Sequence, residues 1–367
     1  MDNNQQLGTR LLRILVIADS KISVPPTGYG GAERVFAHLC EGFARRGHEV
    51  TLMAAEGSRN YGRLITYPWA GQHNVAWRGY CKLNFLLRSA RELISRHDVI
   101  IAGCRTSYLS PFLFAGLPLL YRFGNPIDPN DVDRLINTTK GPLSLVAVSN
   151  HQRAELPPGP WHTIYNGADV SRIACSNRAA GNYLAFIGRM TANKGADIAI
   201  RVAKRAGLPL KIAGNISDER GGRAFFEREI RPRLGGNIEW IGEIGDERKF
   251  EFLAAADALL APIQWDEPCA NVIMESLACG TPVITTRRGC MPELIRDGVT
   301  GFLACNEDEM AHAVARISEI PRQLCRKEAE KRFSTDEMVE GYLDVARELI
   351  ARRYKIFRAL AQQTSTT

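Results

Sequence analysis

Short runs of β-branched and other apolar residues alternate along this chain with longer stretches whose apolar residues have helical spacing. The first run is 12–18, and the stretch 32–46 after it places Val35, Leu39 and Phe43 on one face of a predicted helix. Further runs in the first half lie at 50–54, 98–102, 119–121 and 143–148. Strands that alternate with helices form parallel sheets, so the pattern predicts a doubly wound α/β fold.

The same alternation begins again in the second half, after a polar stretch at 167–181 that we interpret as a linker. The new apolar runs lie at 183–188, 210–214, 238–242, 258–262 and 282–285. A chain of 367 residues is long enough for two domains that each bury their own core. We therefore expect one α/β domain at 1–167 and another at 168–335, with ligands bound in a cleft between the carboxyl ends of the two sheets.

Composition and charge indicate the cellular compartment and the kinds of binding partner to expect. No apolar run approaches the roughly 18 residues that span a bilayer, and the polar N-terminus lacks the pattern of a signal peptide, so we expect a cytoplasmic protein. None of the nine cysteines forms a C-x-x-C pair, which argues against zinc-ribbon and thioredoxin-like sites and favours reduced thiols. The net charge of +7 favours acidic partners such as nucleotide phosphates or anionic lipid headgroups, whereas no nucleic-acid-binding motif accompanies it.

Two glutamates separated by seven residues form the strongest candidate site. Glu267 is expected in the loop after a strand that ends near Pro262, and Glu275 in a helix that begins near Ala270. Carboxylates only accept hydrogen bonds and suit pairs of sugar hydroxyls, whereas the helix N-terminus between them suits phosphate. A sugar nucleotide offers hydroxyls at both ends and a diphosphate in the middle. The alternative is that both glutamates are ordinary exposed charges.

Stretches on both sides of these glutamates resemble the family-4 glycosyltransferases, which are retaining enzymes with the two-domain GT-B fold. The resemblance rests on VPPTGYGGAER at 24–34, RGHEVT at 46–51, YNGAD at 165–169, FIGR at 186–189, KG at 194–195, AAD at 255–257, EPCANVIME at 267–275 and ACGTPVI at 278–284, in the family's order. It implies two Rossmann-like domains that face a central cleft, the first for the acceptor and the second for the donor. It also implies that a C-terminal helix from Asp336, within 336–367, crosses back to the first domain.

The resemblance gives roles to the residues around the two glutamates. Glu275 would bind the ribose hydroxyls and Glu267 the hydroxyls of the transferred sugar. The main-chain N–H groups of Cys269, Ala270, Asn271 and Val272 would contact sugar and phosphate. The family usually has Phe-Gly where this chain has Cys269-Ala270. This departure is expected to reshape the sugar pocket.

Two cations come after the first strand of the second domain. Arg189 follows the strand directly and Lys194 precedes a predicted helix, so both can reach one diphosphate. Fixed cations lower the barrier because negative charge grows on the β-phosphate oxygen as the bond to the sugar breaks. The resemblance makes them the phosphate-binding pair, and with Glu267 they are the candidate catalytic residues. The alternative is two solvated surface charges.

Backbone contacts to the donor are expected at glycines and strand ends. Gly30 and Gly31 allow a close approach of the backbone, and the resemblance places them against the donor phosphate. Gly214, Glu243 and Ile244 end strands of the second domain, where family members hold the base through the main chain. The alternatives are a simple strand-to-helix turn and ordinary loop starts.

The acceptor side departs from the family, whose members commonly carry a histidine after the strand at 98–102 and another after the next strand. Neither is present here, so Arg105, Arg122 and Asn125 are the remaining acceptor candidates, with structural ion pairs as an equal alternative. We predict no metal, because the one D-x-D, at 131–133, does not follow a strand and the seven histidines are dispersed. Cations and a helix dipole can replace a divalent ion.

The segment 77–91 mixes basic and apolar residues. A basic amphipathic helix can lie on anionic lipid, which would suit a lipid-linked acceptor. The alternative, which the sequence favours, is a domain helix with its apolar face on the sheet and a solvated basic face.

Together these features predict a retaining, metal-independent glycosyltransferase of the hexosyltransferase type that needs no cofactor. It would move a sugar from a nucleotide-diphosphate donor, with UDP-sugar favoured over GDP-sugar, to a hydroxyl acceptor in glycan, glycolipid or glycoside synthesis. We expect it in the cytoplasm, peripheral at the inner membrane face if the acceptor is a lipid, and without nucleic acid. A GT-B sugar-nucleotide epimerase and a non-catalytic nucleotide-sugar-binding subunit stay open as alternatives.

Overall fold

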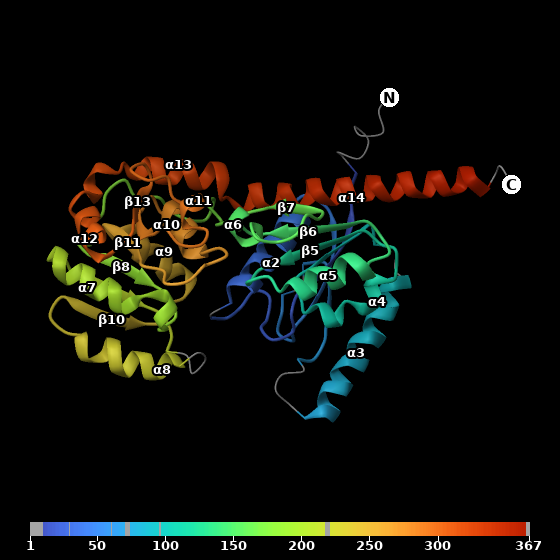
Figure 1. Ribbon diagram of the computed structural model, residues 1–367, viewed down its shortest axis with the longest axis horizontal. Helices are drawn as coiled ribbons and strands as arrows, with labels where there is room; N and C mark the ends of the chain where they lie inside the picture. The colour runs from blue at the N-terminus through green and yellow to red at the C-terminus, as the bar shows by residue number, and fades with distance from the viewer. Residues whose placement is uncertain are drawn as a thin grey trace. The chain divides into compact units, whose positions relative to one another are not determined.

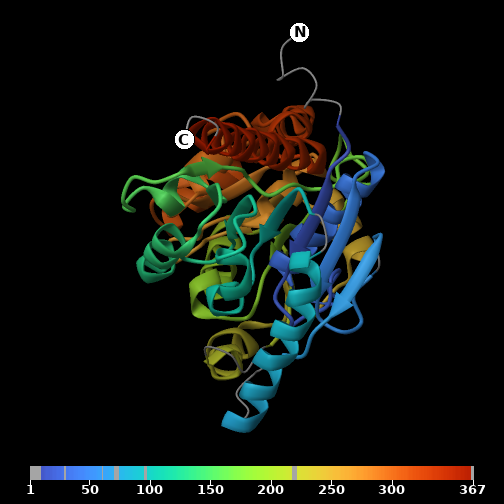
Figure 2. The same cartoon turned by 90° about the vertical axis from the view of Figure 1, so that its right-hand side faces the viewer.

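The computed structural model describes residues 10–28, 30–59, 61–69, 74–94, 97–216 and 221–364. They form two compact units, which Figure 1 and Figure 2 show in ribbon form. Unit 1 comprises Met1–Val148, Arg153–Ile164 and Met338–Thr367, and unit 2 comprises Ser149–Gln152 and Tyr165–Glu337. Each unit contains one parallel sheet with helices on both faces, which confirms the doubly wound α/β prediction.

The sheet of unit 1 has seven strands in the order β3-β2-β1-β4-β5-β6-β7. Their bounds are β1 Arg13–Ile17, β2 Glu49–Ala54, β3 Arg63–Thr66, β4 Val99–Ala102, β5 Leu119–Phe123, β6 Leu143–Ala147 and β7 Trp161–Thr163. Successive side chains of a strand point to opposite faces. Ile14 and Val16 therefore enter one core cluster, and Leu15 and Ile17 enter the other. The edge strands β3 and β7 were not predicted from the sequence.

Helices of unit 1 cover both faces of this sheet. They are α2 Gly31–Arg45, α3 Val75–Ile94, α4 Ser110–Leu113, α5 Pro129–Thr138 and most of α14 Thr335–Thr364. A four-residue helix, α6 Asn150–Arg153, spans the boundary between the units in sequence. The D-x-D segment lies within α5, whose N-cap Asp128 accepts a hydrogen bond from the backbone N–H of Asn130. Among the described residues, no helix has a stretch that is both long and apolar enough to cross a bilayer.

The C-terminal helix α14 packs on unit 1, as predicted. Its apolar positions, including Met338, Tyr342 and Leu349, are buried in the same cluster as α2. Arg46, at the end of α2, donates from Nε to Glu340 Oε1 at 2.7 Å. The last segment of the chain therefore completes the core that the first segment begins.

The sheet of unit 2 has six strands in the order β10-β9-β8-β11-β12-β13. Their bounds are β8 Leu184–Ile187, β9 Leu210–Ala213, β10 Ile238–Gly242, β11 Ala258–Ala261, β12 Val283–Thr286 and β13 Gly301–Ala304. The α-helices are α7 Ala196–Ala206, α8 Gly222–Phe225, α9 Asp246–Ala255, α10 Asn271–Ala278, α11 Met291–Leu294, α12 Glu307–Ala315 and α13 Arg322–Arg332. All the strands and most of the helices contribute to one apolar core.

The strand order reverses beside the first strand of each sheet. In unit 2, β8 lies between β9 and β11, so consecutive connections leave it in opposite directions. Ligands of open parallel sheets bind at the carboxyl ends of the strands beside such a reversal. Arg189 comes just after β8, and Glu267 follows β11. The fold therefore brings the two loops that contain the candidate catalytic residues to one edge of one sheet.

Candidate functional site

Glu267 lies in the loop between β11 and α10, where it is held by two partners of unit 2. Lys194 Nζ forms an ion pair with Glu267 Oε2, and Trp265 Nε1 donates to the same oxygen at 2.7 Å. The Lys194 ammonium also lies 5.7 Å from the centroid of the Trp265 ring. The Glu267 side chain is only 10% exposed. Glu267 and Lys194 are thus neighbours in space, and neither is an isolated surface charge.

Glu275 is buried in the second turn of α10 and pairs with a cation from α9. Lys249 Nζ donates to Glu275 Oε1 at 2.6 Å and lies 2.9 Å from Asp246 Oδ1. Lys249 is 8% exposed and Glu275 is 9% exposed. Buried charges of this kind need a partner, because desolvation is costly. The alternative that both glutamates of the motif are exposed charges is therefore wrong.

The N-terminus of α10 lies in sequence between the two glutamates. Its N-cap, Ala270, provides no side-chain oxygen to the first N–H groups of the helix. Asn271 begins the helix, and its Oδ1 accepts a hydrogen bond from Asn166 Nδ2 at 2.8 Å. Cys269 and Val272 are half-buried. Helix N-termini favour anions, so these positions suit phosphate by their chemistry.

Close backbone contacts place the loops that follow β8 and β11. Gly195 has a φ of 76°, and a Cβ there would lie 2.2 Å from the Pro262 carbonyl oxygen. Gly289 has a φ of 55°, and a Cβ there would lie 2.4 Å from the backbone nitrogen of Glu267. The next residue, Cys290, donates its N–H to the Glu267 carbonyl oxygen at 3.0 Å. Glycine is required at both positions, because the backbones meet directly.

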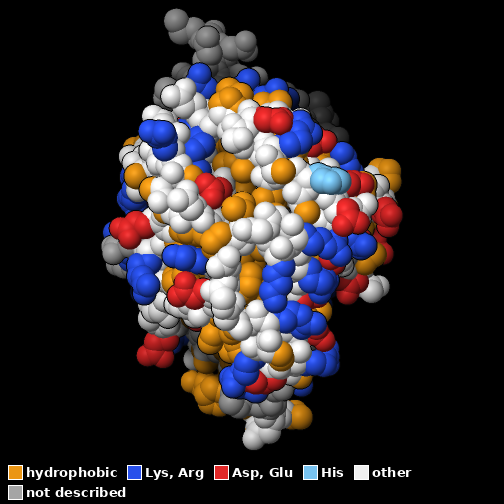
Figure 3. Space-filling view, turned by 90° about the vertical axis from the view of Figure 1, so that its left-hand side faces the viewer, with side chains coloured by type: hydrophobic (Ala, Val, Ile, Leu, Met, Phe, Trp, Pro, Cys, Tyr) orange, Lys and Arg blue, Asp and Glu red, His pale blue; other side chains and the backbone are white. Residues whose placement is uncertain are grey.

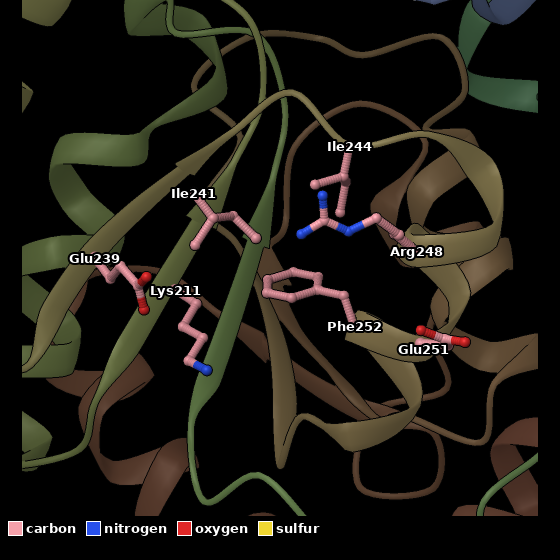
Figure 4. Close-up of a pocket in the computed structure, with 7 residues that line it drawn as sticks. All are labelled: Lys211, Glu239, Ile241, Ile244, Arg248, Glu251 and Phe252. Atoms are coloured by element: carbon pink, nitrogen blue, oxygen red, sulfur yellow. The ribbon is translucent and has the colours of Figure 1, made fainter.

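The remaining donor candidates of unit 2 lie at the ends of β8, β9 and β10. Arg189 is half-buried and lies two residues after the end of β8. Gly214 has a φ of 149°, and its Cβ would lie 1.8 Å from the Gly188 carbonyl oxygen. Glu243 is exposed, whereas Ile244 lines a cavity of about 340 Å³. The cavity lies between β9, β10 and α9 and is lined by Lys211, Glu239, Ile241, Ile244, Arg248, Glu251 and Phe252 (Figure 4).

The donor candidates of unit 1 lie at the start of α2. Gly31 is the first residue of the helix and Gly30 is its N-cap. A Cβ at Gly30 would lie 2.6 Å from the Pro26 Cβ, so the loop is tightly folded there. Burial raises the pKa of Glu33, which lies in the first turn of the helix. These contacts fit a strand-to-helix turn and leave the predicted phosphate contact untested.

The three acceptor candidates differ in their burial. Arg122 is 3% exposed in β5 and lies 5.9 Å from the centroid of the Phe36 ring. Arg105 is half-exposed, with its Nε 3.7 Å from Asp19 Oδ2. Asn125 is exposed. The structural alternative therefore suits Arg122 better than an acceptor role does.

Two residues of this site, Lys249 and Trp265, were not found from the sequence. Lys249 lies four residues before Leu253, which is fully buried in α9. Helical spacing puts both residues on one face, so the sequence could have indicated that Lys249 lies on the buried side of the helix. Trp265 offered only its position two residues before Glu267. The nine cysteines are all free, and among the described residues no group of histidine, cysteine or carboxylate side chains is arranged to hold a metal.

Two family models match the chain, one in each half. The model described as "Glycosyltransferase Family 4" matches residues 29–172, and the model described as "Glycosyl transferases group 1" matches residues 181–319. Each match contains motifs on which the resemblance rests. The second match includes Arg189, Lys194, Glu267 and Glu275.

Similar proteins of known name or structure include several glycosyltransferases. A D-inositol 3-phosphate glycosyltransferase of Acidothermus cellulolyticus is 29% identical over 60% of this chain and 54% of its own length. A glycogen synthase of Thermodesulfovibrio yellowstonii is 29% identical over 51% of this chain and 39% of its own length. The chain spans about half the length of the curated relatives it matches.

Among solved structures, AviGT4, a glycosyltransferase involved in avilamycin A biosynthesis, is 27% identical, with a TM-score of 0.71 over 93% of this chain and 98% of that one. The HepE protein of Anabaena in complex with UDP is 17% identical, with a TM-score of 0.71 over 91% of this chain and 99% of that one. The latter likeness concerns the fold alone. On the two family models, the shared motifs and this common fold, the chain belongs to the family-4 glycosyltransferases (glycosyl transferases group 1) with the GT-B fold.

Proposed function

We propose that this protein is a retaining, metal-independent glycosyltransferase that moves a sugar from a nucleotide-diphosphate donor to a hydroxyl acceptor. The observation that supports this most directly is the pair of buried carboxylates on either side of the α10 N-terminus. Each of them is held by a lysine, Glu267 by Lys194 and Glu275 by Lys249. The order of carboxylate, helix N-terminus and carboxylate along the chain suits a molecule with hydroxyls at both ends and charge in the middle.

In this proposal different residues of unit 2 bind different parts of the donor. Glu275 accepts hydrogen bonds from the ribose hydroxyls, while Lys249 stays paired with its carboxylate. Arg189, Lys194 and the first N–H groups of α10 bind the diphosphate. Lys194 exchanges its contact with Glu267 for the β-phosphate when the donor enters, and Glu267 then accepts from the sugar hydroxyls. Trp265 keeps its hydrogen bond to Glu267 and so holds the carboxylate in place throughout.

The chemical step breaks the bond between the anomeric carbon and the β-phosphate oxygen. The acceptor oxygen bonds to the same face of that carbon, and the departing phosphate oxygen takes the acceptor proton. No separate base is needed, which agrees with the missing histidines of the first domain. Arg189 and Lys194 stabilise the charge that grows on the phosphate, and this preorganised stabilisation is the largest contribution expected from the protein.

We propose a UDP-sugar as the donor, because solved proteins of the same fold hold UDP and UDP-glucose. The main-chain groups of Gly214, Glu243 and Ile244 are the proposed base contacts, and those of Gly30 and Gly31 the contacts from the first domain. Arg105 and Asn125 stay the proposed acceptor residues. We place the reaction in the cytoplasm, without a nucleic-acid partner or a cofactor.

A thermal-shift panel with UDP-, GDP-, ADP- and TDP-sugars tests the donor site. A ligand at about 100 times its Kd stabilises the folded state by about 2.7 kcal/mol, which raises Tm by roughly 5–10 °C in a domain of this size. We expect a UDP-sugar to give the largest shift, and Glu275→Ala and Lys194→Ala each to abolish it. Lys331→Ala, which changes an exposed lysine of α13, is the control. Shifts that survive in both site variants would reject the assignment.

Product analysis then separates the three candidate functions. A glycosylated acceptor, or free sugar released by water, supports the transferase. A free 2-epimer of the donor sugar would identify an epimerase instead. Tight donor binding with neither product, across alcohols, sugars and lipid acceptors, would identify a binding subunit.

A further inference from the structure

Helix α3 (Val75–Ile94) turns most of its apolar side chains away from unit 1. Its buried residues are only Cys81, Phe85, Ser89 and Glu92, which form one narrow strip. Leu93 is half-buried. The other large apolar side chains outside the strip are between 41% and 86% exposed, and they are Val75, Trp77, Tyr80, Leu83, Leu86, Leu87 and Ile94. The expectation that the apolar face of this helix packs on the sheet is therefore wrong.

The exposed apolar residues form a stripe on the side opposite the core. Successive residues of an α-helix turn by about 100°, so Leu83, Leu87 and Ile94 all project nearly opposite Phe85. Tyr80 and Leu86 flank them. We call this stripe, with Val75 and Trp77, the α3 face. In both ribbon views, α3 lies at the rim of unit 1 and its first turns extend beyond the sheet (Figures 1 and 2).

Positive charge borders the α3 face on both edges. At about 100° per residue, Lys82 lies along one edge and Arg88 and Arg91 along the other, whereas Arg78 projects on the same side as Phe85; all four are exposed. The only acidic residue of the helix, Glu92, is fully buried, and its carboxylate pairs with Arg63 at 2.8 Å and His97 at 3.1 Å. The exposed surface of α3 therefore combines a large apolar stripe with four cations and no acid.

Cations on another face of the molecule lie among acidic side chains. On the face of the molecule in Figure 3, Lys and Arg are interspersed with Asp and Glu. In unit 2, for example, Arg201 of α7 pairs with Glu307 of α12 at 2.7 Å, and Arg205 pairs with Asp308 at 2.8 Å. The charge on α3 is not balanced in this way by the helix itself. A surface that offers both negative charge and an apolar phase would complement it.

We propose that the α3 face docks on the surface of a lipid bilayer that contains anionic lipid. An interfacial helix has one apolar face, cations along its border and aromatic residues at headgroup depth, which Trp77 and Tyr80 provide. Anionic headgroups attract Lys82, Arg88 and Arg91 while the leucines enter the acyl boundary. A second copy of this chain is the poorer occupant, because two α3 faces would bring six bordering cations together.

Vesicle co-sedimentation of the full chain tests this directly. The wild type is mixed with vesicles of phosphatidylcholine alone, or of phosphatidylcholine with phosphatidylglycerol, at low and high salt. We expect binding to the anionic vesicles that weakens with salt, and little binding to the neutral ones. Lys82→Gln/Arg88→Gln should weaken binding about five-fold per cation, and Leu83→Gln/Leu87→Gln at least about ten-fold.

Matched controls distinguish binding through the α3 face from non-specific binding to vesicles. Phe114→Gln/Ile136→Gln removes two exposed apolar residues elsewhere in unit 1, and Lys204→Gln/Lys331→Gln removes two exposed cations of unit 2. Both pairs should bind vesicles as the wild type does, and all variants should keep the wild-type Tm because the changed side chains are exposed. Equal vesicle binding by Leu83→Gln/Leu87→Gln, or no binding by the wild type, overturns the proposal. A dimer in sedimentation velocity that this variant abolishes also overturns it, because the face would then join two copies.

Discussion

Replacing Lys249 by methionine tests the buried pair beneath the proposed ribose site. The ammonium lies 2.6 Å from Glu275 Oε1, and both residues are less than a tenth exposed. Methionine keeps most of the apolar stem and removes the charge, so Glu275 is left buried without its cation. Breaking a buried pair in this way costs about 3–5 kcal/mol. An exposed pair contributes about 0–1 kcal/mol at most.

The assay is urea unfolding of the full chain, with the free energy of unfolding taken from the midpoint and slope. We expect Lys249→Met and Glu275→Gln each to lower it by several kcal/mol. The double variant should lose less than the sum, because it leaves neither Lys249 nor Glu275 as an unpaired buried charge, with a coupling of about 0.5–3 kcal/mol. Arg205→Met, which breaks the exposed pair with Asp308, is the control and should change little.

Additive losses in the double variant, or a loss below about 1 kcal/mol for Lys249→Met, would refute the reasoning about this pair. The same variant also reports on function. If Glu275 holds the ribose, Lys249→Met weakens nucleotide binding even at a temperature where the protein is fully folded. The Arg205→Met control should bind nucleotide normally.

Three further predictions follow from single contacts. Gly289→Ala should lower transferase kcat/KM at least about ten-fold, because the added Cβ would meet the Glu267 backbone. Gly298 also has a positive φ but has open space around it. The control Gly298→Ala should therefore cost only about 1–2 kcal/mol of stability. Trp265→Phe removes one hydrogen bond to the Glu267 carboxylate, worth about 1.5–3 kcal/mol, so kcat/KM for the donor should fall roughly ten- to hundred-fold while UDP binding is kept. Burial lowers the pKa of His48. Below about pH 6.5, His48 therefore binds more protons in the unfolded chain than in the folded one. As the pH is lowered, the free energy of unfolding should decrease more steeply in the wild type than in His48→Asn.

Each of these has a contrary outcome. Equal activity of the two glycine variants would mean that the 289–290 turn does not hold Glu267. A Trp265→Phe variant that loses UDP binding and sugar transfer together would place the indole outside the sugar subsite. Parallel pH profiles for the wild type and His48→Asn would assign the acid sensitivity to other groups.

The sequence predicted most of the fold because buried parallel strands read as continuous apolar runs. The strand β1 and its neighbours were located this way, and so were five of the six strands of unit 2, whose edge strand β13 was missed. The edge strands β3 and β7 were missed because their residues are mostly half-buried and of mixed polarity. For α3 the spacing indicated an amphipathic helix, but it could not show which face the protein covers, because Phe85 and Leu87 read alike in sequence.

The candidate site was predictable where the chemistry lies in a motif and not where it depends on packing. Glu267, Glu275 and Lys194 were named from their spacing and neighbours. Lys249 and Trp265 act through contacts that require α9, α10 and the loop after β11 to be placed in space. Lys249 lies 26 positions from Glu275, and no local pattern joins them.

The central claim is that unit 2 binds a nucleoside diphosphate sugar between its two buried glutamates. A crystal structure of the full chain with the nucleotide sugar that gives the largest thermal shift tests it most directly. We predict ribose hydroxyls within hydrogen-bond distance of Glu275 and the diphosphate between Lys194 and the first turn of α10. Electron density for the nucleotide at any other place, with both carboxylates still paired only to their lysines, would contradict the claim.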